Sequence, residues 1–270
     1  MLILALMLFL LAGLFLPLYP LSIGVNLLLQ RQDASTNGRL AAPAVRAALV
    51  ALMPLIGLGL MQLGLMLAAD RGQGLITAFA LWGGLTSVLY AFRLLSVRDG
   101  QIWVAQLYSS ALALIWVGAV HQVPLLLPTL GLALSLLPLI WLLAALRRRF
   151  GIVRVGLYPG LGMRMPVFAA LFVAAVLMAV AVPFSPAFFA IATIAFGGVG
   201  ANELLTLVPL SLAWLLWTWA GVNLLSGIVF GVPREDLDYA DFNRGNALRY
   251  GAGILALSLF GIYLVEGALG

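Results

Sequence analysis

Four polar side chains within the long apolar stretches of this sequence are of types that can bind or pass an ion: Arg46, Gln62, His121 and Glu266. Ionisable groups are costly inside a bilayer, and they mark ion or proton pathways where they occur there. Each of the four also has a more ordinary role. Arg46, His121 and Glu266 lie near the ends of apolar runs, where they would reach the membrane interface. Gln62 is neutral and suits a hydrogen bond between helices. The four are therefore candidate polar membrane residues.

The sequence contains no residue set that is typical of catalysis, cofactor binding or metal binding. It has one histidine and no cysteine, which excludes disulfides, thiolate metal sites and cysteine catalysis. The acidic residues Glu235, Asp236, Asp238 and Asp241 leave a divalent-cation or substrate site open, but their spacing does not match an EF-hand. We therefore expect no catalytic residues, no cofactor, no metal and no enzymatic activity of the chain by itself.

Composition sets the class of protein. The chain has 270 residues, of which 64% are hydrophobic and 9% charged, and its mean hydropathy is +1.15. A soluble domain cannot bury this much apolar surface, so the sequence predicts an all-α integral membrane protein with many spans. No linker or internal repeat divides it. We expect a single membrane domain over 1–270, in which 1–40 forms an N-terminal span and loop.

The elements that must position the polar side chains are apolar runs of about 20 residues, the length that crosses a bilayer core. One further stretch, 183–200, contains prolines and glycines and should break a helix. Its apolar part, Ala187–Phe196, is short for a crossing, so we expect eight transmembrane helices, or nine if this part crosses alone. The eight runs are Met1–Ile23, Ala44–Ala69, Leu75–Leu95, Ile102–Val120, Val123–Leu146, Pro166–Val182, Thr206–Phe230 and Ala252–Leu269.

The basic residues, which are all arginines, predict the orientation. The densest group consists of Arg147, Arg148, Arg149, Arg154 and Arg164, between two apolar runs. Short loops rich in Lys or Arg stay in the cytoplasm, and eight spans place nearly all the arginines on one side, with both termini outside. We expect a multi-pass protein of a bacterial-type inner membrane. Its arginine-rich loops would be cytoplasmic and contact anionic lipid headgroups, not nucleic acid.

Three motifs, in the same order, resemble one family. Ala91–Ser110 joins two apolar runs through a polar junction and ends in the sequence LYSS. Gly160–Pro166 (GLGMRMP) and Gly227–Pro233 (GIVFGVP) are the other two. They resemble segments of the antiporter-like membrane subunits of NADH:quinone oxidoreductase (complex I) and of the Mrp-type cation/proton antiporters. The resemblance runs over 42–269 and corresponds to about the C-terminal half of those proteins, whereas 1–40 matches only as a generic span.

The departures from the family concern its proton relay. The resemblance places the family's titratable relay residues at Leu55, Trp103, Leu137 and Ile191, none of which titrates in this sequence. A proton must move between titratable groups, so an aliphatic or indole side chain cannot hand one on. These four are therefore degenerate relay positions. The resemblance therefore implies the fold of the family without its proton pumping.

The resemblance implies a membrane subunit of an energy-coupling complex that acts as a non-pumping scaffold or modulator. Its expected partners are a full-length antiporter-like protein, other membrane subunits and the lipid bilayer, in a complex that can include a NADH:quinone oxidoreductase-like enzyme. Three alternatives stay open. The chain could transport ions or protons itself through Arg46, Gln62, His121 or Glu266, it could be a membrane enzyme with a site in the 231–249 loop, or it could be a membrane protein of unrelated role.

Overall fold

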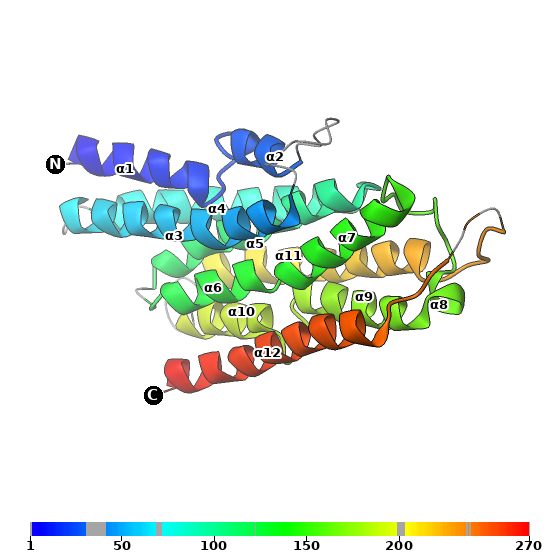
Figure 1. The fold of residues 1–270 in the computed structure, drawn as a ribbon. Helices are drawn as coiled ribbons and strands as arrows, with labels where there is room; N and C mark the ends of the chain where they lie inside the picture. The colour runs from blue at the N-terminus through cyan, green and yellow to red at the C-terminus, as the bar shows by residue number, and fades with distance from the viewer. Residues whose placement is uncertain are drawn as a thin grey trace.

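The computed structural model describes residues 2–30, 42–68, 72–121, 123–198, 203–235, 237 and 239–269, without the side chains of 203 and 264–269. Every regular element in these ranges is a helix, which confirms the all-α prediction, and the long helices run side by side along one direction (Figure 1). The helices are α1 (Leu2–Phe15), α2 (Ile23–Gln30), α3 (Pro43–Ala68), α4 (Gly72–Leu94), α5 (Gly100–Ala119), α6 (Leu126–Leu134), α7 (Leu137–Phe150), α8 (Leu161–Arg164), α9 (Pro166–Ala179), α10 (Pro186–Gly197), α11 (Glu203–Ile228) and α12 (Arg244–Leu269).

Within the described residues, five helical segments are long and apolar enough to cross a membrane. They are α3, α4, α5, α6 together with α7, and the part of α11 from Leu204 to Ile228. Three further apolar helices, α1, α9 and α10, are shorter. These lengths fit a multi-pass membrane protein. Figure 1 shows α1 beginning and α12 ending at the same end of the bundle, as the eight-helix arrangement requires.

The first predicted span, Met1–Ile23, is interrupted. α1 ends at Phe15 and α2 begins only at Ile23, so the run Met1–Ile23 is not one continuous helix. Pro17 and Pro20 explain the interruption. A proline has no N–H to donate to the helix, and it pushes the residue before it out of the helical conformation.

The predicted broken helix is present, but its irregular part is shorter than the expected 183–200. α9 ends at Ala179, and α10 is regular from Pro186 to Gly197. Between them, Ala181 and Phe184 have φ angles of 61° and 72°. Residues other than glycine rarely adopt this backbone conformation, and it cannot continue a right-handed helix.

A second break, which the sequence analysis does not predict, divides the run Val123–Leu146. α6 ends at Leu134 and α7 begins at Leu137. Pro138 lies in the first turn of α7, where its missing N–H and fixed φ are tolerated but where a helix from upstream cannot continue. Figure 1 shows α6 and α7 following the same direction, so the pair forms one interrupted crossing.

Helix α5 lies in the centre of the bundle, and nearly all of its residues are buried. The rings of Phe9, Phe79 and Trp116 join α1, α4 and α5, with centroids 5.1–5.8 Å apart. A β-carbon added at Gly83 on α4 would lie 2.7 Å from the carbonyl oxygen of Ala113 on α5. The absent side chain of Gly83 therefore allows the close approach of these two helices.

Candidate functional site

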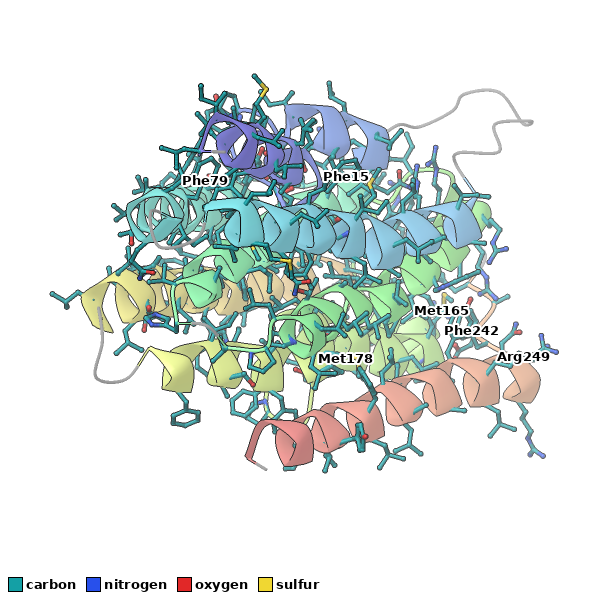
Figure 2. All side chains as sticks on the ribbon, turned by 90° about the vertical axis from the view of Figure 1, so that its left-hand side faces the viewer. Phe15, Phe79, Met165, Met178, Phe242 and Arg249 are labelled. Carbon is teal, nitrogen blue, oxygen red and sulfur yellow. The ribbon has the colours of Figure 1, made fainter. Side chains whose placement is uncertain are left out.

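One end of the bundle collects the arginines of the part of the chain that the structure describes. They lie at the start of α3 and α12, at the end of α4 and α7, in α8 and in the neighbouring loops. Figure 2 shows the nitrogen-bearing side chains gathered at the end that carries Arg249. This end therefore has a positive potential, which attracts anionic groups. These arginines are Arg46, Arg93, Arg98, Arg147, Arg148, Arg149, Arg154, Arg164, Arg234, Arg244 and Arg249.

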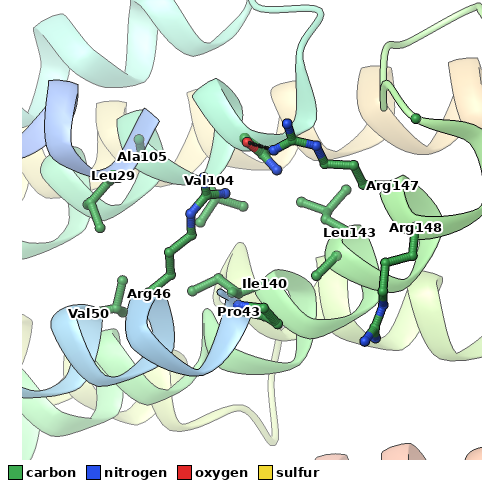
Figure 3. Close-up of a pocket in the computed structure, with 13 residues that line it drawn as sticks. Leu29, Pro43, Arg46, Val50, Val104, Ala105, Ile140, Leu143, Arg147 and Arg148 are labelled. Atoms are coloured by element: carbon green, nitrogen blue, oxygen red, sulfur yellow. Dashed lines mark hydrogen bonds between the residues drawn. The ribbon is translucent and has the colours of Figure 1, made fainter. Parts of the chain in front are cut away.

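A cavity of about 460 Å³ lies at this end, between α2, α3, α5 and α7 (Figure 3). Arg46 and Arg147 line it, and Arg46 is only 8% exposed. Nη1 of Arg147 donates a hydrogen bond of 3.1 Å to Oε1 of Gln101, whereas Arg148 turns the other way (Figure 3). The rest of the wall is mainly apolar, with Leu29, Val50, Val104, Ile140 and Leu143 among its residues.

This cavity is suited to binding an anionic or polar group. A guanidinium offers five N–H donors and stays charged, so Arg46 and Arg147 can hold an anionic or polar group against the apolar wall. None of the described residues that line the cavity has a side chain that titrates near neutral pH. A general acid or base needs such a group within hydrogen-bonding reach of the reacting atom.

A neutral hydrogen-bonded cluster joins α2, α4 and α5 in the buried core. Nδ2 of Asn26 donates to the hydroxyl of Tyr90 at 3.0 Å, and the hydroxyl of Ser109 donates to Oδ1 of Asn26 at 3.0 Å. Ser22 and Tyr90 share a further bond of 2.8 Å. Buried polar groups in a membrane protein are costly unless they are paired, and each of these groups has a neighbour with which to pair.

A second neutral cluster joins α4, α5 and α11. The hydroxyl of Ser110 donates to the carbonyl oxygen of Ser87 at 2.7 Å and accepts from Nε1 of Trp217 at 2.7 Å. A serine inside a helix often bonds to a carbonyl of its own helix. Here Ser109 and Ser110 instead bond to three other helices, so the LYSS sequence holds the centre of the bundle together.

The four candidate polar membrane residues do not meet. Arg46 lines the cavity at the arginine end, and Gln62 is exposed on α3 beside a separate cavity of about 360 Å³. His121 follows the end of α5 at the opposite end, where its Nε2 bonds to Oγ1 of Thr206. Burial lowers the pKa of His121 below its usual value. Glu266 belongs to α12, but its side chain is outside the described residues.

The four residues that the resemblance aligns with the family's proton relay lie on four helices. Leu55 is half-buried on α3, and Trp103 is buried in the first turn of α5. Leu137 is the first residue of α7, directly after the unpredicted break, and Ile191 is buried in α10. Trp103 and Ile191 belong to the buried hydrophobic core and Leu137 packs against it, whereas Leu55 does not.

The sequence analysis missed a structural role of Asp241. Its carboxylate oxygens accept hydrogen bonds from the backbone N–H groups of Val167 and Phe168, at 2.9 and 3.0 Å. These N–H groups belong to the first turn of α9, where a helix leaves its donors without partners and favours a negative charge. Of the other acidic candidates, Glu235 is exposed, and Asp236 and Asp238 are outside the described residues. The described part of the chain contains no metal-binding cluster of His, Cys, Asp and Glu.

Comparison by sequence finds a similar protein of Aquifex aeolicus (strain VF5), described as uncharacterized. It is 26% identical over 170 residues, which are 61% of this chain and 70% of that protein. No family model matches the chain.

Comparison by structure finds likenesses to chains of membrane complexes over nearly the whole length of this chain. A chain of respiratory complex I from Thermus thermophilus has a TM-score of 0.80 and 19% identity, and the match covers 98% of this chain and 56% of that one. For a chain of the Mrp complex of Dietzia sp. DQ12-45-1b, the TM-score is 0.75 and the identity 16%, and the match covers 96% of this chain and 55% of that one. For a chain of an archaeal membrane-bound sulfane sulfur reductase, the TM-score is 0.79 and the identity 17%, and the match covers 98% of this chain and 53% of that one.

The chain spans about half the length of the solved chains that it matches. At these identities the likeness is one of fold. This protein therefore has the fold of the antiporter-like membrane subunits of complex I and the Mrp complex.

Proposed function

We propose that this protein is a non-pumping membrane subunit that packs beside a full-length antiporter-like protein in an energy-coupling complex. One observation carries the proposal. The hydrogen bonds that join α2, α4, α5 and α11 in the core are made by neutral groups, those of Asn26, Ser109, Ser110, Tyr90 and Trp217 among them. Neutral amide, hydroxyl and indole groups hold helices together, but they do not take up and release protons near neutral pH.

The degenerate relay positions support the same proposal. A proton relay needs titratable side chains that lie close enough to exchange protons. Trp103 and Ile191 occupy two of these positions and are buried in the hydrophobic core. The buried arginine, Arg46, lies at one end of the bundle, and its guanidinium stays charged in proteins, so it cannot act as a relay.

We also propose that the arginine end faces the cytoplasm, in a bacterial-type inner membrane. The positive-inside rule supports this orientation, because the described arginines gather at the end opposite to the first turn of α1. Cysteine accessibility tests it, since the chain has no cysteine of its own. A single cysteine introduced at exposed Arg154 should react with a membrane-impermeant maleimide only after the cells are opened.

Transport activity of the purified chain tests the non-pumping role. We expect proteoliposomes that contain the full chain to dissipate a proton or sodium gradient no faster than empty liposomes. Gradient-driven flux that is lost in His121→Ala or in Arg46→Gln would show a transporter in its own right and overturn the proposal. An unrelated reconstituted membrane protein controls for leakage through the liposomes.

Affinity purification tests the proposed partner. From a mild-detergent extract of native membranes, the tagged chain should retain other membrane proteins, including one that is similar to it but about twice its length. Recovery of the chain alone, under conditions in which it stays folded and monodisperse, would contradict the subunit role.

A further inference from the structure

A second cavity, of about 850 Å³, forms a groove between α7 and α12. It is separate from the cavity that Arg46 lines, although Arg148 borders both, and α12 lies along the outside of the bundle (Figure 1). Three exposed arginines line it, Arg148 and Arg149 at the end of α7 and Arg249 near the start of α12. Its volume lies within the range of clefts that hold small ligands, about 300–1,000 Å³.

The groove changes from charged to apolar along its length. On α7, the lining residues Arg148, Ala145, Trp141 and Leu137 recur every three or four positions, so they lie on one face of the helix. At 1.5 Å per residue, Leu137 lies about 17 Å from Arg148 along the axis. On α12 the lining extends from Arg249 to Leu257, about 12 Å further in. One leaflet of the hydrocarbon core is about 15 Å thick, so the apolar wall has the depth of one leaflet.

The charge at the mouth of the groove has no counter-charge among the described residues that line it, since none of these is acidic. The guanidinium of Arg149 lies 5.4 Å from the ring centroid of Phe242, a cation–π contact that holds it at the mouth. Asp241 precedes Phe242 in the chain, but its carboxylate accepts three backbone N–H bonds. The arginines at the mouth are therefore available to an anionic group from outside the protein.

We propose that this groove binds a phospholipid with an anionic headgroup, taken from the leaflet at the arginine end. The headgroup phosphate lies between Arg148, Arg149 and Arg249, and an acyl chain follows the wall past Trp141 and Leu257. Charge complementarity favours this occupant, because each arginine near an anionic lipid surface adds to the attraction. A neutral lipid would leave the three guanidiniums without an anionic partner beyond its own phosphate.

Native mass spectrometry of the purified full chain tests the headgroup preference. The chain is titrated with phosphatidylglycerol and, separately, with phosphatidylcholine of the same acyl chains. We expect phosphatidylglycerol to bind about tenfold more tightly or better. The double variant Arg148→Gln/Arg249→Gln should lose this preference. The matched control Arg154→Gln/Arg164→Gln removes the same charge from exposed arginines outside the groove, and it should keep the preference.

A variant that fills the groove tests the position without changing the charge. A β-carbon built at Gly253, which lines the groove on α12, meets no heavy atom within 4 Å. Gly253→Phe should therefore enter the groove without displacing a packed neighbour, and it should weaken phosphatidylglycerol binding about tenfold. Thermal unfolding in lipid-free detergent checks that each variant is folded.

Three results would overturn the proposal: equal binding of the two lipids by the wild type, equal losses in the two arginine pairs, or unchanged lipid binding in Gly253→Phe. A photo-crosslinker at Trp141 provides an independent test in native membranes. It should capture phospholipid, and capture of another polypeptide in its place would assign the groove to a protein partner.

Discussion

The hydroxyl oxygen of Ser135 accepts a hydrogen bond from the backbone N–H of Ala187, 2.9 Å away. Ser135 lies in the break between α6 and α7, and Ala187 in the first turn of α10. The N–H groups of a first helical turn have no acceptors within the helix. Ser135 supplies an acceptor for Ala187 from a neighbouring crossing, and the hydroxyl oxygen of Ser185 accepts from the N–H of Phe188. The two interrupted crossings therefore support each other in the interior of the bundle.

Ser135→Ala should destabilise the protein by about 1–2 kcal/mol, because the buried N–H of Ala187 loses its acceptor. Thermal or denaturant unfolding in detergent measures the change. Ser226→Ala is the matched control, since Ser226 is exposed on α11 and its hydroxyl bonds to the carbonyl oxygen of Asn223. It should change stability by less than about 0.5 kcal/mol. An equal effect of the two substitutions would contradict the role given to Ser135.

Asp241→Ala should also destabilise the fold, by about 1–2 kcal/mol, because the first turn of α9 loses its acceptor and a favourable charge. Asp241→Asn keeps one acceptor oxygen and should lose less. Glu235→Ala removes an exposed carboxylate from the same loop and serves as the control. Unfolding is measured with and without EDTA. A loss that appears only when divalent cations are present would favour the alternative of a metal site in the 231–249 loop.

Gly83→Ala should destabilise the protein and weaken the packing of α4 on α5. The added methyl group would lie 2.7 Å from both the carbonyl oxygen of Ala113 and Cβ of Trp116, so one of the helices must move. Overpacking of this kind costs about 1–3 kcal/mol. Gly59→Ala on α3 meets nothing within 4 Å. It should instead stabilise the helix by about 0.5–1 kcal/mol, and the two unfolding temperatures should therefore shift in opposite directions.

A double-mutant cycle measures the bond between Ser110 and Trp217. Ser110→Ala and Trp217→Phe should each destabilise the protein, and the double variant should lose less than the sum of the two. We expect a coupling free energy of about 0.6 kcal/mol, the average for hydrogen bonds between membrane helices, and at most about 1.7 kcal/mol. A coupling of zero would show that the neutral cluster contributes nothing to the stability of the core.

The stability of the protein should fall as the pH is lowered below about 6.5, the ordinary pKa of histidine. Burial lowers the pKa of His121, so the folded state favours the neutral ring. The unfolded chain takes up a proton first, and the stability that depends on neutral His121 is lost as the pH falls through the folded pKa. Melting temperatures between pH 7.5 and 5.5 measure this loss. His121→Gln should reduce the dependence on pH, and an unchanged profile would assign it to other groups.

Much of the fold was predictable from the sequence because hydropathy and charge are properties of short segments. The long apolar runs predict α3, α4, α5 and α11 within a few residues, since each must span the same hydrophobic thickness. The three ordered motifs predicted the fold shared with the complex I and Mrp subunits. The prolines at 183 and 186 indicated the break before α10, but Pro138 lies inside a longer apolar run, and its break was missed.

The sequence by itself determined that this is a multi-span helical membrane protein with its arginines in loops and near helix ends, and with apolar residues where the resemblance places a proton relay. Only the tertiary structure decided which groups pair. Asp241 caps a helix that begins 75 residues earlier, Ser135 bonds to a residue 52 positions away, and Arg148 and Arg249 meet at one groove. The geometry of a hydrogen bond or a cavity depends on atomic positions to within a fraction of an ångström. These positions are set only when all the helices pack together.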